Sequence, residues 1–230
     1  RMDTFVVEQQ CSYPEIDDQD ASTLICDFMI CARCGIVDRE RSRIRADSLC
    51  PACGQRAGVA RLYYPVSIHI LVDLVQESYH SYARVGPISG PQTSTIGPIL
   101  FFCTLREALI NHLLLENLRA EGTKQSLIER LLDDNKLAHQ KFGALFRAVV
   151  GTSWADGVRE ASLYDGTDYQ AVSNLMKLTA SIRNDFLHDG AGWSASRELA
   201  TECVDRLPQL FDLFVALHNV YIHPLLTAQH

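Results

Sequence analysis

The sequence predicts a mainly α-helical protein, in which an antiparallel helical bundle follows a small β-rich module held together by cysteines. Three observations lead to this prediction. Apolar residues recur at helical spacing over most of the chain from residue 98 onward. Two Cys-x-x-Cys pairs stand near the N-terminus, at residues 31–34 and 50–53. The composition, 47% apolar and 21% charged over 230 residues, is typical of a globular chain with one main core and one smaller unit.

The N-terminal part of the sequence divides into an acidic lead and a strand. The lead, residues 1–22, contains a group of carboxylates: Glu8, Glu15, Asp17, Asp18 and Asp20. Residues 24–30 then have the apolar composition of a strand, bounded on the N-terminal side by polar residues. We therefore expect a weakly ordered lead and a strand that runs into the first cysteine pair.

A metal site is predicted by four cysteines: Cys31, Cys34, Cys50 and Cys53. Fifteen residues separate the two pairs, a spacing typical of tetrahedral zinc. Gly35 and Gly54 directly follow the second cysteine of each pair and allow the backbone to turn tightly there. The module, residues 23–62, resembles a zinc ribbon. Because four thiolates complete the coordination sphere, we expect one structural Zn²⁺ per chain, which contributes to folding and not to catalysis.

Two disulfides are the alternative interpretation of these cysteines. No secretory signal peptide is recognisable, and in a cytoplasmic protein the same spacing favours a metal. We expect a cytoplasmic protein without a membrane segment, because the chain has no run of eighteen apolar residues. The other cysteines have no paired spacing and are expected to pack in the interior: Cys11, Cys26, Cys103 and Cys203.

Residues 63–97 predict a bridge between the cysteine module and the bundle. Tyr64 to Tyr82 carry an apolar helical pattern after Pro65. Three Gly-Pro pairs with serines and threonines between them, over residues 86–97, then predict a linker. The predicted domains are thus an acidic lead at 1–22, a zinc ribbon at 23–62, a bridging helix and linker at 63–97, and a helical bundle at 98–230.

Five helices are expected in the bundle. Pro98 suits a first helical turn, and the glycines at 122 and 151 mark helix ends. Residues 152–167 contain polar residues and glycines and predict a loop, and Pro208 predicts a kink in the last helix. The expected helices span residues 99–120, 124–132, 136–150, 169–188 and 194–226. Short turns between them favour an antiparallel bundle.

A short polar motif ends the fourth of these helices. Arg183, Asn184 and His188 set a permanent cation, an amide and a titratable imidazole within about two helical turns. Arginine can hold a phosphate bidentately, and histidine can exchange a proton near neutral pH. Asn184 and His188 share a helix face, whereas Arg183 lies about 140° away round an ideal helix. Because Asp189 and Gly190 follow, the motif also fits an ordinary helix C-terminus with a solvated arginine.

The pattern Arg-Asn-x-x-x-His, late in an all-helical segment, resembles the signature of the HEPN (higher eukaryotes and prokaryotes nucleotide-binding) superfamily. Many members of that superfamily are ribonucleases. The resemblance covers at most residues 98–225, and its specific part is the hexapeptide 183–188. It implies a HEPN-like helical bundle in which two protomers bring their motifs together at one composite site, and therefore a homodimer.

The resemblance also implies a chemistry. The expected activity is metal-independent endoribonuclease cleavage, in which the ribose 2′-hydroxyl attacks and leaves 2′,3′-cyclic phosphate and 5′-hydroxyl ends. His188 would transfer protons, Arg183 would hold the scissile phosphate, and Asn184 would orient the phosphate or the imidazole. Supporting roles would fall to neighbouring polar residues: Asp185, Glu107, Arg106 and Asp189.

The partners implied by this resemblance are an RNA substrate and a protein partner such as an antitoxin, because many such nucleases serve in toxin or antiviral defence systems. A second interpretation is a non-catalytic dimerisation or adaptor protein, whose zinc ribbon binds a protein or a nucleic acid. Four histidines on predicted helices are expected to be packing residues outside any site: His69, His80, His112 and His139.

The charge distribution limits how RNA can be bound. A net charge of −7 argues against a protein that wraps nucleic acid over its whole surface. The predicted ribbon is locally basic, with Arg33, Arg39, Arg41, Arg43, Arg45, Arg56 and Arg61. This basic patch fits contact with RNA or an acidic partner, and it fits a solvated loop equally well.

Overall fold

Helices dominate the computed structural model, so the predicted mainly α class is confirmed. The structure describes residues 25–38, 48–56, 61–85, 91–190 and 195–228. Its elements are β1 (Met29–Ile30), β2 (Arg61–Leu62), α2 (Val66–Val85), α3 (Pro91–Ala120), α4 (Gln125–Asp134), α5 (Ala138–Gln140), η1 (Lys141–Leu145), α6 (Phe146–Val150), α7 (Trp154–Asp165), α8 (Gln170–Asp189), α9 (Arg197–Asp205), α10 (Leu207–Leu217), η2 (His218–Ile222) and α11 (His223–Thr227). The predicted acidic lead, 1–22, lies outside the described residues.

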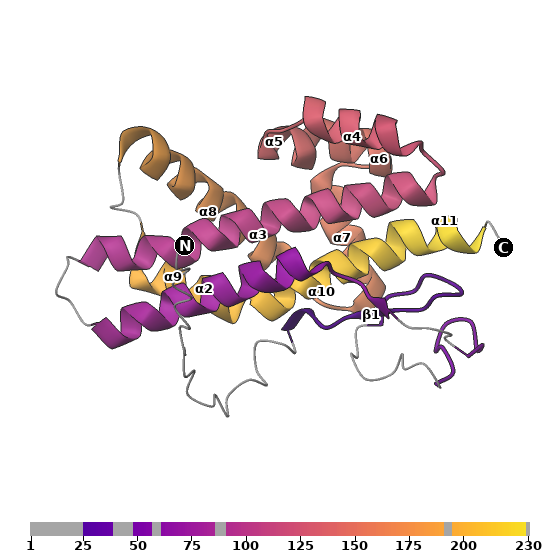
Figure 1. Ribbon diagram of the computed structural model, residues 1–230, viewed down its shortest axis with the longest axis horizontal. Coiled ribbons are helices and arrows are strands. Elements are labelled where there is room, and N and C mark those ends of the chain that lie inside the picture. The colour runs from indigo at the N-terminus through magenta and orange to yellow at the C-terminus, as the bar shows by residue number, and fades with distance from the viewer. Residues whose placement is uncertain (1–24, 39–47, 57–60, 86–90, 191–194, 229–230) are drawn as a thin grey trace, which may run out of the picture.

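The helices α2 and α3 form the central pair of the fold and run side by side (Figure 1). Ile68, Val72 and Val75 of α2 recur at three and four residues and are buried against α3. Gly97 lets the two helices approach closely, since a Cβ atom at this position would lie 3.3 Å from the Cβ of Ser78. Figure 1 shows α4, α5 and α6 on one side of α3 and β1 on the other. The predicted bridging helix is therefore present as α2.

The linker predicted for residues 86–97 is wrong over its second half, because α3 begins at Pro91. Residues 86–90 lie outside the described residues. Pro98, predicted to open the helix, lies inside it. Tertiary burial outweighed the local signals: Ile96 and Ile99 are buried in the main core, and the Thr95 hydroxyl donates a hydrogen bond to the carbonyl of Ala195. Proline is also well accepted in a first helical turn, which suits Pro91.

The helices predicted at 124–132 and 136–150 are present, the second with an interruption. The first corresponds to α4. The second is divided into α5, η1 and α6, because residues 141–145 form a π-helical segment. Gly151 ends it with a φ of 85°, as predicted for a helix-terminating glycine. Such single π turns inside α-helices frequently lie at functional sites.

The loop predicted for residues 152–167 is wrong, because residues 154–165 form α7. Ser153 caps this helix by accepting the backbone N–H of Asp156 at 3.1 Å. Gly157 was one reason to expect a loop, but it lies where α7 meets the core: a Cβ atom there would come within 3.1 Å of the Phe146 ring. The glycine therefore serves close helix packing and not chain reversal.

The C-terminal part contains more than the one kinked helix predicted at 194–226. The helix predicted at 169–188 is confirmed as α8. After it, Arg206 separates α9 from α10, and Pro208 occupies the first turn of α10. Proline has no N–H to contribute to a helix interior but is preorganised for a first turn. Pro208 therefore begins a helix where the sequence predicted a kink.

The described residues of the cysteine module contain little regular structure, so its expected β-rich character is not confirmed. Met29–Ile30 pairs antiparallel with Arg61–Leu62, and single bridges join Ile30 to Val37 and Leu49 to Arg56. The strand predicted for 24–30 is limited to its last two residues, and Ile25 and Cys26 are helical.

The module and the helices share one hydrophobic core. Phe28 is fully buried, with its ring stacked on Phe211 of α10 at a centroid distance of 6.4 Å. Two polar contacts secure the first cysteine turn on η2. The His218 Nε2 atom lies 2.8 Å from the Gly35 carbonyl oxygen. The Asn219 side chain accepts from Val37 N–H at 3.0 Å and donates to the Val37 carbonyl at 2.8 Å.

Replacing Asn219 with alanine is expected to lower the free energy of unfolding by about 2–4 kcal/mol, because it leaves both backbone groups of Val37 buried without their side-chain partner. Val37 is 1% exposed, so water cannot replace the amide. The melting temperature should fall by roughly 5–15 °C. Asn174→Ala, at an exposed position of α8, is the matched control and should shift it far less. Equal melting temperatures for the two variants would contradict the anchoring role of Asn219.

Among the described residues, two stretches of helix are apolar and long enough to cross a membrane by length and composition, Thr95–Ala120 and Leu207–Thr227. Within each, 56% of the most apolar window is buried inside the fold. Core helices of soluble proteins show this combination of apolar composition and burial. The structure is thus consistent with a soluble protein.

Candidate functional site

The helix α8 places the Arg-Asn-x-x-x-His motif on the wall of a pocket of about 450 Å³. One stripe of α8 is buried in the core, and the adjoining stripe faces the pocket. The pocket stripe consists of Ser173, Met176, Lys177, Ala180, Arg183, Asn184 and His188. Their spacing of three and four residues puts them on one side of the helix. Gly190 ends α8 with a φ of 65°, which leaves His188 in the last turn at the rim.

The opposite wall comes from α3 and from the segment between α4 and α7. It consists of Arg106, Leu137, Ala138, His139, Phe142 and Trp154. Phe142 belongs to the π-helical η1, and its ring meets Trp154 edge to face at a centroid distance of 4.7 Å. Trp154 Nε1–H donates to the Ser173 hydroxyl at 3.1 Å, which joins the two walls. The aromatic pair gives the pocket a rigid apolar surface beside its polar one.

Two arginines share one carboxylate behind the pocket. Arg183 donates to Glu107 of α3 in an ion pair, and Arg106 lies 3.6 Å from the same carboxylate oxygen. Arg106 is 5% exposed, donates to the Met176 carbonyl at 2.7 Å and lies 5.3 Å from the centre of the Phe142 ring. Burial lowers the pKa of Arg106, because its charge is poorly solvated. An anion bound in the pocket, in addition to Glu107, would stabilise the positive charge of Arg106.

The pocket wall is electropositive although the chain as a whole is acidic. Arg106, Lys177 and Arg183 line it, and none of the described lining residues is a carboxylate. Together with the carboxylate of Glu107, these three side chains carry a net charge of two positive units. Such a wall in a partly enclosed pocket favours a bound anion, and the volume is in the range of small-ligand sites.

The structure brings together some of the predicted site residues and not others. The pocket is lined by Arg183, Asn184 and His188. Glu107 is connected to it by its ion pair with Arg183. The sequence placed Arg183 apart from Asn184 and His188 round the helix, but its long side chain reaches the same pocket. Arg183 also donates a hydrogen bond to the Asn184 amide oxygen at 3.2 Å. Asp185, a predicted supporting residue, is exposed and is not among the residues that line the pocket.

Several lining residues were not predicted from the sequence. His139 was expected to be a packing residue, yet it is exposed and lines the pocket. Lys177 lies seven residues before Asn184 on α8, about two helical turns, so helical periodicity was a usable signal for it. Phe142 and Trp154 gave no such signal, because the π-helical turn and the helix α7 that position them were not predicted.

The four cysteines of the module form a second candidate site. The thiol sulfurs of Cys31, Cys34, Cys50 and Cys53 lie within 4.8 Å of one another. Cys34 Sγ and Cys50 Sγ are 3.6 Å apart. Two sulfurs bound to one tetrahedral zinc at about 2.3 Å would be about 3.8 Å apart, whereas a disulfide bond is about 2.05 Å long. The geometry therefore fits a metal ion and not disulfides.

The backbone supports this arrangement. In each turn the glycine N–H bonds to the carbonyl of the first cysteine at 2.9 Å, Gly35 to Cys31 and Gly54 to Cys50. Both glycines have positive φ, 74° and 66°, as the sequence predicted. Burial raises the pKa of the Cys34 and Cys50 thiols, so thiolates need a cation beside them. Burial likewise raises the pKa of Cys103 and Cys203, which are inert core residues as predicted.

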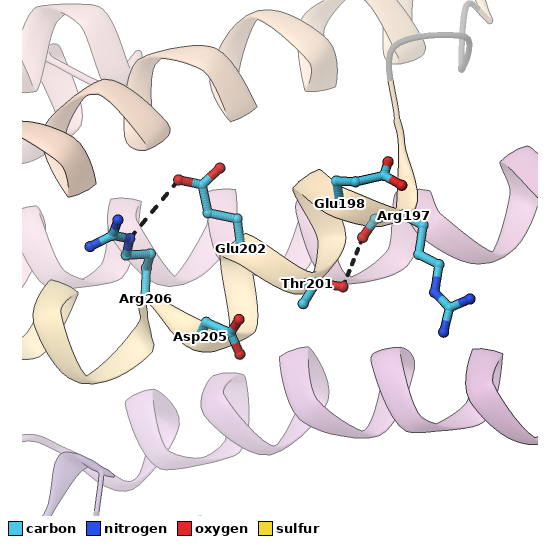
Figure 2. A pocket seen from close by; sticks show the side chains of 6 residues that line it. All are labelled: Arg197, Glu198, Thr201, Glu202, Asp205 and Arg206. Atoms are coloured by element: carbon cyan, nitrogen blue, oxygen red, sulfur yellow. Dashed lines mark hydrogen bonds and ion pairs between the residues drawn. The ribbon is translucent and has the colours of Figure 1, made fainter.

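A shallower hollow of about 690 Å³ lies along α9 (Figure 2). It is lined by Arg197, Glu198, Thr201, Glu202, Asp205 and Arg206. Figure 2 shows the two arginines near opposite ends of this row, with the three carboxylates between them. Arg206 Nε is 3.9 Å from Glu202, and the Thr201 hydroxyl donates to the Arg197 carbonyl at 2.9 Å. These local contacts are those of a solvated helix face, so we assign no site here.

The chain was compared with models of protein families, with curated proteins and with solved structures, and none of the three comparisons found a match.

Proposed function

We propose that this protein is an endoribonuclease that cleaves RNA without a catalytic metal, as the HEPN-like motif implies. The observation that carries the proposal is the pocket, which Arg183, Asn184 and His188 line together with two further cations and a second imidazole. RNA supplies the anion that this wall favours. The aromatic pair of Phe142 and Trp154 offers a face or an edge for one unstacked base, as is common in recognition of single-stranded RNA.

The cations bind and stabilise phosphate in this proposal. Arg183 holds the scissile phosphate and offsets the charge that develops on the phosphorane. Glu107 keeps the guanidinium of Arg183 in place, and Asn184 contacts it from the same helix. Arg106 is buried at the base of the wall, so its guanidinium is held in a fixed position and adds positive electrostatic potential to the pocket. Lys177 binds an adjoining phosphate.

Two histidines serve the proton transfers. Transesterification needs one group that accepts the 2′-hydroxyl proton and one that protonates the 5′ leaving oxygen. His188 and His139 lie on opposite walls of the same pocket and are both exposed to solvent. We assign these two roles to this pair. The products are a 2′,3′-cyclic phosphate and a 5′-hydroxyl end.

The cysteine site binds one structural Zn²⁺ in this proposal. Four thiolates close a tetrahedral coordination sphere, so no position remains for substrate or activated water. The ion holds both cysteine turns, and thereby Gly35 and Val37, against η2. RNA cleavage should accordingly persist in EDTA for as long as this ion is retained.

We further propose a cytoplasmic homodimer as the working form. Leu178 and Leu187 of α8 are 50% and 64% exposed. Apolar side chains left exposed beside a site favour contact with another protein surface. Toxin or antiviral action with a protein inhibitor follows only from the family resemblance. A non-catalytic adaptor, whose cysteine module binds its partner, is the alternative outcome of the test below.

The test is incubation of the purified protein with labelled single-stranded and structured RNAs in EDTA, followed by analysis of the product ends. Cleavage with cyclic-phosphate ends, at a rate proportional to protein concentration, is expected. Cleavage that requires added Mg²⁺, or that leaves 3′-hydroxyl ends, would overturn the proposed chemistry. Absence of cleavage with every RNA would favour the adaptor.

Glu107→Gln is expected to lower the turnover of RNA by about 10- to 100-fold, because Arg183 loses the partner that positions it. The affinity for RNA should not fall, since loss of the carboxylate makes the net charge at the pocket more positive by one unit. This opposite response of turnover and affinity separates a positioning residue from a solvated pair, which would change neither. Glu116→Gln on the same helix removes a carboxylate that pairs with Arg119 outside the pocket and is the control.

A further inference from the structure

A second cluster of metal-ligating side chains lies apart from the four-cysteine site. Cys26 and Asp27 lie three and two residues before the start of β1 at Met29, and His69 lies in the first part of α2. The three ligand atoms lie within 4.8 Å of one another. Cys26 Sγ is 3.1 Å from His69 Nδ1, and His69 Nδ1 is 3.6 Å from an Asp27 carboxylate oxygen. The sequence offered no such signal, because the ligands are 43 residues apart and Cys26 and His69 were expected to be packing residues.

The distances match the separations that one bound ion imposes. With Zn–S at about 2.3 Å and Zn–N and Zn–O at about 2.0–2.2 Å, tetrahedral angles place sulfur and nitrogen about 3.6 Å apart and nitrogen and oxygen about 3.4 Å apart. The observed distances of 3.1 and 3.6 Å differ from these by a few tenths of an ångström. Small rotations of the side chains are enough to reach ligand geometry.

The hydrogen bond between Cys26 and His69 accounts for that pair but does not by itself account for the position of Asp27. A single atom, His69 Nδ1, faces both the thiol and the carboxylate, and the carboxylate at 3.6 Å is beyond ordinary hydrogen-bond distance. The other ring nitrogen, Nε2, is buried and has no hydrogen-bond partner among the described residues. The contacts at Nδ1 therefore point all three groups toward one shared point, and a cation there would be bound by each of them.

The ligand set indicates the kind of ion. A thiolate, a neutral imidazole and a carboxylate together carry two negative charges, which a divalent cation neutralises. This mixture of sulfur, nitrogen and oxygen suits Zn²⁺ better than Mg²⁺ or Ca²⁺, which prefer oxygen alone. Cys26 is 1% exposed, whereas the side chains of His69 and Asp27 are 19% and 34% exposed. Because two of the three ligands are partly exposed, water can reach the ion and complete its coordination.

We propose that Cys26, Asp27 and His69 form a second, three-ligand zinc site that joins the segment before β1 to α2. The site is distinct from the four-cysteine site, because it shares no ligand with it and its cysteine belongs to the main core. Binding of an ion between two segments so far apart in the chain stabilises the folded state only. Open coordination makes this ion easier to remove than one held by four thiolates.

The test is the zinc content of the full-length protein after dialysis against micromolar Zn²⁺, measured by inductively coupled plasma mass spectrometry. The wild type is expected to hold one zinc per chain more than His69→Ala. The measured quantity is the difference in zinc content between the wild type and His69→Ala. The result therefore depends neither on RNA cleavage nor on occupancy of the four-cysteine site. His80→Ala, at an exposed position of the same helix, should retain the wild-type content.

Asp27→Asn provides a second measurement if His69→Ala folds poorly. Its carboxylate is partly exposed and the amide has nearly the same shape, so the fold should be retained. One zinc equivalent should be lost to a chelator at a concentration at least tenfold lower than in the wild type. Equal zinc contents in the wild type and His69→Ala, or an unchanged chelator titration in Asp27→Asn, would overturn the site and leave an ordinary packed cluster.

Discussion

Replacing His188 with alanine is expected to lower the rate of RNA cleavage by about 10²- to 10⁴-fold, the usual contribution of a general acid or base. His188 lies in the last turn of α8 on the pocket wall, and its side chain is exposed. Its loss should therefore remove a proton-transfer group without leaving a cavity in the core. The measurement is the single-turnover cleavage rate in EDTA with a labelled RNA.

The controls for this variant separate chemistry from folding. Zinc content and melting temperature should equal those of the wild type, since no described core contact involves His188. His80→Ala, an exposed histidine on α2 outside the pocket, should cleave at the wild-type rate. His139→Ala should lose activity to a similar degree if the two imidazoles divide the proton transfers. A wild-type rate in His188→Ala would show that the cleavage, if any, arises elsewhere.

Removal of the zinc ion proposed for the four-cysteine site should have the largest effect on the free energy of unfolding. Few apolar side chains pack around these sulfurs, chiefly Met29 and Ile36, so hydrophobic burial alone cannot hold the two cysteine turns in place. Structural zinc typically supplies about 10–16 kcal/mol of binding free energy at neutral pH. A strong chelator, or the variant Cys34→Ser, should therefore unfold both cysteine turns.

Hydrogen exchange measured by mass spectrometry can locate this effect. The amides of Cys31, Gly35, Cys50 and Gly54, which are hydrogen-bonded within the two turns, should lose protection, whereas the amides in the middle of α3 should keep it. The melting temperature should fall as well, because the hydrogen bonds that join Gly35 and Val37 to η2 are lost. Ala52→Ser, which keeps all four cysteines, is the control. Unchanged protection in the metal-free protein would contradict a structural role for the ion.

Local periodicity was enough to predict most of the helices. α2, α4 and α8 correspond closely to the stretches predicted from their apolar spacing, because each helix buries one stripe of its own sequence. The prediction failed where glycine and proline were interpreted as chain breaks. Gly97 and Gly157 lie inside helices, where their missing side chains allow close contact with Ser78 and Phe146. A glycine needed for packing and one needed for a turn look the same in a sequence.

The candidate site could be predicted only in part for a similar reason. The motif at 183–188 and the two cysteine pairs are local patterns, and the structure places each group of side chains together. The pocket is completed by Arg106, Phe142 and Trp154, which come from segments up to 77 residues away from Arg183 (183 − 106). No spacing rule connects them to the motif, because the bundle and a π-helical turn set their positions.

The sequence by itself determined the helical class, the two paired-cysteine turns and the polar motif on α8, because each depends on neighbours within a few residues. The tertiary structure alone decided which residues face the motif across the pocket, that Glu107 binds two arginines, and that Cys26 and Asp27 meet His69. The physical reason is the range of the interactions. Hydrogen bonds along a helix and ligand spacing in a turn are local, whereas the electrostatics of a pocket arise from the packing of distant segments.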